Sequence, residues 1–209
     1  MSVSHERITG AAMRLFAETG ASQVSLSELA KAAGVARGTI YNNFSQPENL
    51  FEVIATDLAD EMHERVASAM EGIDNPAERL SNGIRFFIRR AYDEPVWGKF
   101  IARFGLTSQS LQGMVLGQPA VDLRRGRESG HFLFEADQET QILTLVGAAA
   151  VTAMRTVLEG NQPWRRAGSD ASEFVLRGLG MSRVEARRIA SLELPELRVV
   201  EARRGGNSS

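Results

Sequence analysis

The amino-acid sequence predicts an all-α protein with a short N-terminal domain of three helices and a longer helical domain behind it. Apolar residues recur at spacings of three and four along most of the 209 residues, whereas the alternation typical of strands is almost absent. Only six prolines occur, and most of them stand where a helix would begin or has just ended. Because 43% of the residues are hydrophobic, the chain can bury a substantial core.

The composition excludes several kinds of site. There is no cysteine, so the protein has neither disulfides nor thiolate metal ligands. The longest apolar stretch, residues 143–154, contains two threonines and a glycine and stops at Arg155, so we expect no membrane span. No apolar signal core follows the first residues, and the expected location is therefore the cytoplasm.

The net charge of −2 hides an uneven distribution. Residues 1–46 carry four basic and three acidic side chains, whereas residues 47–74 carry eight acidic side chains and a single base, Arg65. A surface that binds an anion is therefore expected outside residues 47–74.

Three helices are expected in the N-terminal domain. The first covers residues 5–18, and its apolar face is formed by residues at spacings of three and four, namely Ile8, Ala12, Leu15 and Phe16. Gly20 follows it as a C-cap. Ser25 opens the second helix and forms a capping box with Glu28, and Gly34 ends it. The third covers residues 36–44, so two short helices flank a tight turn, which is the helix-turn-helix arrangement.

The second domain is expected to begin with one long helix over residues 47–70, with Pro47 in its first turn. Further helices are expected over residues 76–92, 95–106, 137–158, 170–179 and 183–191. Residues 107–131 contain four glycines and Pro119, so one or two interrupted helices are expected there. Residues 198–209 are predicted to be a disordered tail.

A set of residues with fixed spacing runs through residues 5–52: Phe16 and Gly20, Ser25, Leu29-Ala30, Ala33-Gly34-Val35, Gly38-Thr39-Ile40-Tyr41, Phe44 and Leu50-Phe51. This pattern resembles the TetR/AcrR family of bacterial transcriptional regulators. The resemblance implies a DNA-binding domain over residues 1–46 and an effector-binding and dimerisation domain over residues 47–197, joined by the helix over residues 47–70. It also implies a homodimeric repressor that binds a palindromic operator in double-stranded DNA and leaves it on binding a small molecule.

The polar residues left outside the small N-terminal core are the candidates for DNA contact. Arginine can read guanine and asparagine can read adenine, whereas hydroxyl groups suit phosphate oxygens, and a glycine lets the backbone approach. The candidates are Ser27, Lys31, Arg37, Gly38, Thr39, Tyr41, Asn42 and Asn43. The alternative is a small helical subdomain whose polar residues are merely solvated.

The motif departs from the family pattern at three positions. Ala36 stands where a capping Ser or Thr is usual, so the third helix lacks a side-chain cap, at a cost of about 1 kcal/mol. Pro47 stands where a Lys that contacts phosphate is common in the family. Without that contact, the slope of log K for DNA binding against log salt concentration should fall by about one unit. Asn43 stands where a His is frequent.

The resemblance implies that the last two long helices pair with those of a second copy. The residues that offer an apolar or small surface there are Ile142, Val146, Ala149, Ala150, Ala153, Phe174 and Val175. The alternative is that these faces belong to the core of a single chain.

The resemblance also implies an internal effector cavity. Aromatic residues and methionines build adaptable apolar cavities, and the candidates are Met62, Phe87, Trp97, Phe100, Phe104, Leu111, Met114 and Met154, with Phe86 beside them. An apolar or aromatic effector is expected. A stripe of this kind can equally be ordinary core.

Two other functions are compatible with a helical chain of this length, an enzyme and a regulator without an effector. An enzyme has little support, because the sequence lacks the common nucleotide-binding, hydrolase and zinc-protease motifs. The histidines, His5, His63 and His131, are scattered, so neither a metal site nor a cofactor is expected. A regulator that binds DNA without an effector, or under the control of a partner protein, remains open.

Overall fold

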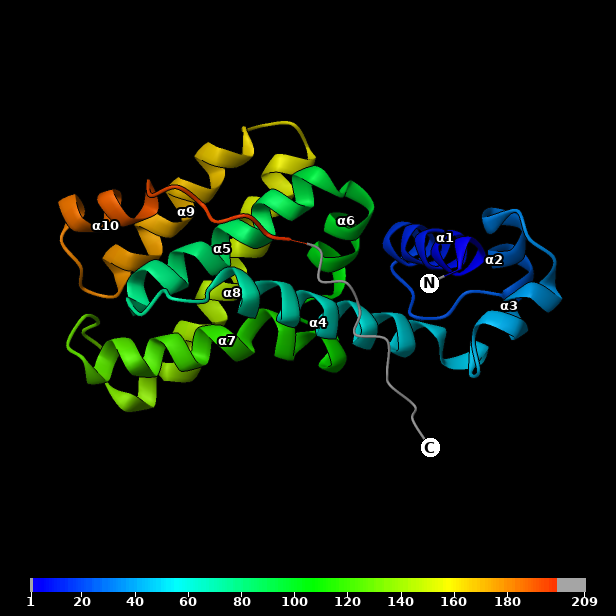
Figure 1. Ribbon diagram of the computed structural model, residues 1–209, viewed down its shortest axis with the longest axis horizontal. Helices are drawn as coiled ribbons and strands as arrows, with labels where there is room; N and C mark the ends of the chain where they lie inside the picture. Colours follow the sequence, from blue (N-terminus) through cyan, green and yellow to red (C-terminus); the bar gives the residue numbers. More distant parts are fainter. Residues whose placement is uncertain (1, 199–209) are drawn as a thin grey trace.

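The computed structural model describes residues 2–198, and every regular element within them is a helix. The expected all-α fold is thus confirmed. Three short helices form one end of the molecule, and a long helix leads from them into a larger helical body (Figure 1). Apart from Arg198, the tail expected over residues 198–209 lies outside the described residues.

The N-terminal domain consists of α1 (Val3–Thr19), α2 (Leu26–Ala33) and α3 (Arg37–Asn43). The glycine C-caps and the capping box expected from the sequence are present. Gly20 and Gly34 end α1 and α2 with φ values of 71° and 63°, in the left-handed region that glycine adopts easily. The Ser25 hydroxyl accepts the Glu28 N–H at 3.1 Å, and the Glu28 carboxylate accepts the Ser25 N–H at 3.3 Å.

Arg7 fixes the turn between α2 and α3. Its guanidinium donates hydrogen bonds to the carbonyl oxygens of Ala33 and Gly34, at 2.8 and 3.0 Å. These carbonyls lie at the C-terminal end of α2, where a helix leaves acceptors without partners. Ile40 and Phe44 are buried under α3. The three helices are therefore held as one rigid unit.

A single 3₁₀ turn, Pro47–Asn49, leads into α4 (Leu50–Ala69), which leaves the N-terminal domain. An aromatic cluster fixes this exit. The Phe51 ring of α4 lies 5.2 Å from the Phe16 ring of α1, and 5.5 and 5.0 Å from those of Phe100 and Phe104. These last two belong to α6 (Pro95–Phe104), so α1, α4 and α6 meet at one point.

The larger body is built around α5 (Pro76–Asp93), which packs against α6, α7, α8, α9 and α10. The remaining helices are α7 (Gln109–Glu128), α8 (Glu139–Leu158), α9 (Trp164–Gly178) and α10 (Arg183–Ala190), with a 3₁₀ turn, Ala136–Gln138, before α8. The C-terminal segment returns across α5 and α4, because Arg85 and Arg65 donate to the carbonyl oxygens of Leu192 and Leu197, at 2.7 and 2.9 Å.

Two helices differ from the expectation. Helix α7 is continuous through Pro119, because it packs against α4, α5 and α8 and buries Leu111, Met114 and Leu123. Packing thus outweighs its glycines and proline. Helix α9 begins at Trp164 instead of residue 170, because Ala167 and Gly168 are already buried against α5.

Contrary to the expectation from the sequence, one helix has the length and hydropathy of a membrane span. The segment Ala136–Leu158 is long and apolar enough to cross a membrane, with a mean hydropathy of 1.5. The threonines and the glycine in this segment scarcely lower its mean hydropathy. Only 28% of its most apolar window is buried within this chain, so much of its apolar surface faces outward. Length and composition do not distinguish a span from a helix that packs on other protein.

Candidate nucleic-acid interface and internal cavity

Helix α3 presents a polar face at the tip of the molecule. Arg37, Gly38, Tyr41 and Asn42 are exposed, and the Tyr41 side chain is 54% exposed although it is large and partly apolar. As expected, Ala36 provides no side-chain cap for this helix. The arrangement leaves a guanidinium, a phenol and a carboxamide free to contact another molecule.

Thr39 and Asn43 are half-buried and less available. The Asn43 amide nitrogen donates to the Thr39 carbonyl oxygen at 2.7 Å, and its oxygen accepts the Ser2 hydroxyl at 2.9 Å. Among the expected DNA contacts, Asn43 is thus engaged within the domain. It ties the start of α1 to the end of α3.

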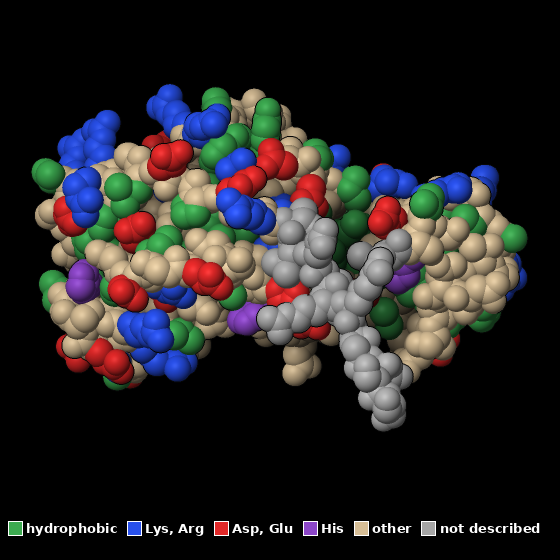
Figure 2. Space-filling view, viewed as in Figure 1, with side chains coloured by type: hydrophobic (Ala, Val, Ile, Leu, Met, Phe, Trp, Pro, Cys, Tyr) green, Lys and Arg blue, Asp and Glu red, His purple; other side chains and the backbone are tan. Residues whose placement is uncertain are grey.

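Ser27 and Lys31 are exposed on α2, beside the polar face of α3. Lys and Arg side chains gather along the upper rim of the end formed by the three short helices (Figure 2). This rim suits a polyanion better than the acidic helix that follows, because the exposed carboxylates of α4 would repel phosphate.

An internal cavity of about 40 Å³ lies between α4, α5, α7 and α8. Three of the residues expected at a ligand site lie on its wall, namely Met62, Phe87 and Met114. The others are buried elsewhere in the core: Trp97, Phe100, Phe104, Leu111 and Met154, together with Phe86. Phe100 and Phe104 instead form the aromatic cluster between the two domains.

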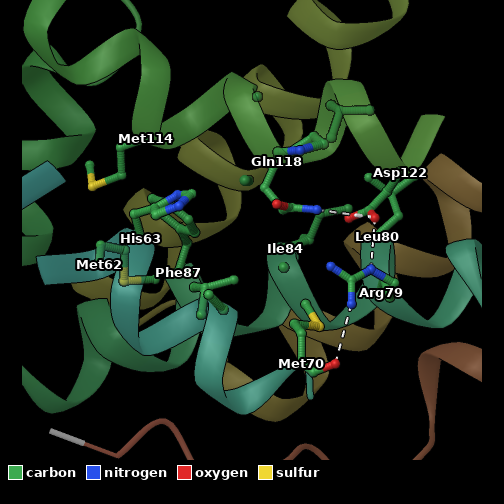
Figure 3. A pocket seen from close by; sticks show the side chains of 17 residues that line it. Met62, His63, Met70, Arg79, Leu80, Ile84, Phe87, Met114, Gln118 and Asp122 are labelled. Atoms are coloured by element: carbon green, nitrogen blue, oxygen red, sulfur yellow. Dashed lines mark hydrogen bonds and ion pairs between the residues drawn. The ribbon is translucent and has the colours of Figure 1, made fainter. Parts of the chain in front are cut away.

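The cavity has an apolar end and a polar end (Figure 3). Met62, Phe87 and Met114 lie at one end, and Arg79, Gln118 and Asp122 at the other. The Arg79 Nε donates to Asp122 Oδ1 at 2.8 Å, and Gln118 Nε2 lies 3.3 Å from the same oxygen.

The polar end was missed by sequence reasoning. Arg79 and Asp122 are 43 positions apart, and no local pattern pairs them. Arg79 also donates to the carbonyl oxygens of Met70 and Ile73, at 3.2 and 3.1 Å, where α4 has just ended. The polar end of the cavity is therefore bonded to the end of α4.

A second charged network lies beside the apolar end. Arg90 of α5 pairs with Glu61 at 2.8 Å and with Glu94 at 3.1 Å, and its Nη1 lies 3.5 Å from the Met62 sulfur. Arg65 pairs with Glu61 at 3.0 Å. Two arginines thus neutralise Glu61 of α4, and Met62 links this network to the cavity.

The outer face of α8 and α9 forms an open apolar groove. Six of the residues expected at a dimer interface line it, namely Ile142, Val146, Ala149, Ala153, Phe174 and Val175. Val146 and Ala150 are buried and line the internal cavity. Leu145 lines it as well and is 68% exposed, and sequence reasoning did not include it.

Within the described residues, no group of three or more His, Asp or Glu side chains could hold a metal ion. His5 stacks on Phe44, and His63 lies on the cavity wall beside the methionines.

Comparison with protein families matches both parts of the chain. Residues 8–54 match the model for bacterial regulatory proteins of the tetR family, which covers the three short helices and the start of α4. Residues 75–192 match the tetracyclin repressor-like C-terminal domain, which covers α5 to α10.

Curated relatives match over shorter regions. An uncharacterised HTH-type transcriptional regulator of Mycobacterium tuberculosis is 29% identical over 116 residues, 56% of each chain. The HTH-type transcriptional regulator AcrR of Shigella flexneri is 47% identical over 51 residues, 24% of each chain. The matches therefore cover about half of the length of the first relative and about a quarter of the second.

Solved structures match over nearly the whole chain. RolR in complex with resorcinol is 26% identical, with a TM-score of 0.68 over 93% of this chain and 96% of RolR. FadR of Bacillus subtilis in complex with stearoyl-CoA is 20% identical, with a TM-score of 0.67 over 83% of this chain and 98% of FadR. The second likeness shows the fold alone.

Proposed function

The chain belongs to the TetR family and is a DNA-binding transcriptional regulator rather than an enzyme, and on this premise we propose that it is a homodimeric repressor, released from a palindromic operator by a small effector. In this proposal residues 1–46 bind DNA in the cytoplasm, residues 47–197 bind the effector and the second copy, and α4 joins the two parts.

The exposed polar face of α3 is the observation that carries the proposal. A recognition helix must be rigid, and it must offer side chains that match the edges of bases. Ile40 and Phe44 anchor α3 in the domain, while Arg37, Tyr41 and Asn42 are exposed on it. In the proposal, Arg37 and Asn42 read bases, whereas Tyr41, Thr39, Ser27 and Lys31 contact phosphates.

The groove on α8 and α9 supports the dimer. One recognition helix covers too few base pairs to define an operator, so regulators of this type use two. Phe174 and Leu145 are large apolar side chains, 65% and 68% exposed, on a face lined mainly by aliphatic and small residues. A second copy with the same face would bury both, in a bundle of four helices.

The cavity supports an effector that acts through α4. Met62 and His63 of α4 lie on its wall, and α4 also carries Phe51, which contacts the N-terminal domain. A molecule that moves α4 would thus change the separation of the two recognition helices. RolR, a structural relative, has been solved with resorcinol, a small aromatic molecule of the kind that this proposal requires.

The proposal is tested by selecting genomic fragments with the purified protein at physiological salt. The expected result is one enriched palindrome, bound by a dimer. A folded dimer that enriches no sequence would contradict the proposal. With the operator known, small aromatic compounds including resorcinol are titrated into the complex. If none releases the DNA, the regulator works without an effector or under the control of a partner.

A further inference from the structure

Asp122 is a buried carboxylate, and within the described residues only one of its two oxygens accepts hydrogen bonds. Its side chain is 2% exposed, and it lies on the wall of the cavity. Both of its hydrogen bonds, from Arg79 and Gln118, end on Oδ1. Among residues 2–198, no donor is bonded to Oδ2. Because Asp122 lines the cavity and this oxygen accepts no hydrogen bond, it offers a position for a donor on a ligand.

The charge around Asp122 limits what the donor can be. Arg79 already neutralises the carboxylate, so the polar end of the cavity carries no net charge. The exposed His63 is at the opposite end (Figure 3). An anionic or cationic ligand would therefore lose its hydration without gaining an opposite charge, which is costly in a buried site. A neutral hydroxyl group needs only the free oxygen.

The other end of the cavity suits a ring. Phe87, Met62 and Met114 form an apolar wall at the end opposite the carboxylate, and Ile84 lies between the two ends. The space of about 40 Å³ is smaller than the cavity of about 150 Å³ that holds benzene elsewhere. Methionine side chains are flexible and change rotamer readily, so Met62 and Met114 can make room for a ring.

We propose that the effector is a small neutral aromatic molecule with a hydroxyl group, and that this hydroxyl donates a hydrogen bond to Oδ2 of Asp122. The inference rests on the proposed function, because it takes the cavity to be the effector site. It adds the chemical class of the ligand and the residue that recognises it. In this site Asp122 selects for the hydroxyl, and the methionine wall accepts the ring.

The test is a series of ligands that share one ring, measured by calorimetry on the full chain. Phenol offers a donor, anisole offers only an acceptor, and toluene offers neither, while benzoate and benzylamine are charged. We expect phenol to bind about tenfold or more tightly than anisole and toluene, since a hydrogen bond to a charged group is lost in both. The two ions should bind most weakly.

Three variants locate the acceptor. In Asp122→Asn, the amide must keep its oxygen toward Arg79, so its NH₂ group faces the cavity, and the preference for phenol over anisole should vanish. Glu128→Gln removes the same charge from an exposed position on α7 and should leave the preference intact. His63→Leu should also leave it intact, whereas its loss there would make His63 the acceptor and overturn the inference.

The outcomes separate this inference from the proposed function. If all neutral rings bind equally, the cavity is an effector site but Asp122 does not select the ligand, and the inference is wrong. If the folded protein binds its operator but no compound in the series, both the effector part of the proposed function and this inference fail. Because the series is measured on the unmodified protein, it does not depend on whether Asp122→Asn folds.

Discussion

Tyr41 and Asn42 are neighbours on α3, both exposed, and their side chains suit different contacts with DNA. A carboxamide can pair with the edge of adenine, whereas a phenol serves a phosphate oxygen, which is the same at every base pair. The positions of the two residues on the helix do not show which of them would contact bases and which phosphates. Binding measurements on operators with single base-pair substitutions distinguish the two kinds of contact.

The first prediction concerns this pair. Asn42→Ala should abolish the preference at one base pair per half-site, worth about 1–3 kcal/mol, and bind other sequences nearly as before. Tyr41→Phe should weaken binding to every sequence but leave the salt dependence unchanged, because the phenol hydroxyl carries no charge. Both are measured by titrating labelled operators with single substitutions at several salt concentrations. A uniform loss in Asn42→Ala would exclude it as a base reader.

Two glycines allow a second prediction. A methyl group added at Gly83 of α5 or at Gly113 of α7 would meet no heavy atom within 4 Å, but only Gly83 lies on the cavity wall. Both Gly→Ala changes should stabilise the fold by about 0.5–1 kcal/mol, measured by thermal unfolding. Only Gly83→Ala should weaken effector binding, because its methyl fills part of a small cavity. Equal effector affinity in both variants would place the effector elsewhere.

At the scale of helices, the short N-terminal elements were predictable because their signals are local. Ser25 and Glu28 are three residues apart, and Gly20 and Gly34 each directly follow a helix. The limits of α7 and α9 depend on distant partners instead. Pro119 is tolerated because α4, α5 and α8 pack around α7, and no window of sequence contains that information.

The residues of the cavity also fall into two groups, those that the sequence could indicate and those that only the fold brings together. Met62, Phe87 and Met114 could be proposed from composition, because sulfur and aromatic side chains are typical of such walls. Trp97 and Phe100 have the same composition signal, yet they are buried away from the cavity. Asp122 and Arg79 carried no signal at all, since charged residues on helices are usually solvated and only the fold places these two together.

The third prediction concerns the connection between α4, α5 and α7. Arg79 bonds Asp122 with one edge of its guanidinium and the end of α4 with another. Arg79→Lys keeps the charge beside Asp122 but cannot reproduce this planar set of donors. We expect effector affinity to change by less than about threefold, while the fall in operator affinity caused by the effector shrinks by about tenfold.

Binding of effector and operator is measured separately and together for this variant. Arg124→Lys serves as control, because Arg124 is an exposed arginine of α7 that pairs with Glu139, away from the cavity. Full release of the operator in Arg79→Lys would show that the signal reaches α4 by another route, such as Met62 and Arg90.

At the scale of the whole molecule, the position of the recognition helix depends on two junctions. The aromatic cluster fixes the domain of α3 to α4 and α6, and in the proposed dimer the groove on α8 and α9 would fix one copy to the next. In the proposed dimer, a rotation of α4 within one chain would therefore change the distance between the two copies of α3, which a palindromic operator would sense.

The last prediction removes that second junction. Phe174 is 65% exposed in the single chain, so Phe174→Arg should cost the folded monomer little, yet it would bury two charges at a two-fold interface. We expect a folded monomer by sedimentation, with much weaker binding to the palindrome but unchanged binding to a half-site. Val184→Arg is the control, because Val184 is an apolar side chain of α10, 81% exposed and outside the groove. If Phe174→Arg remains a dimer with full operator affinity, the two copies meet through another face, and the apolar surface of α8 requires a different explanation.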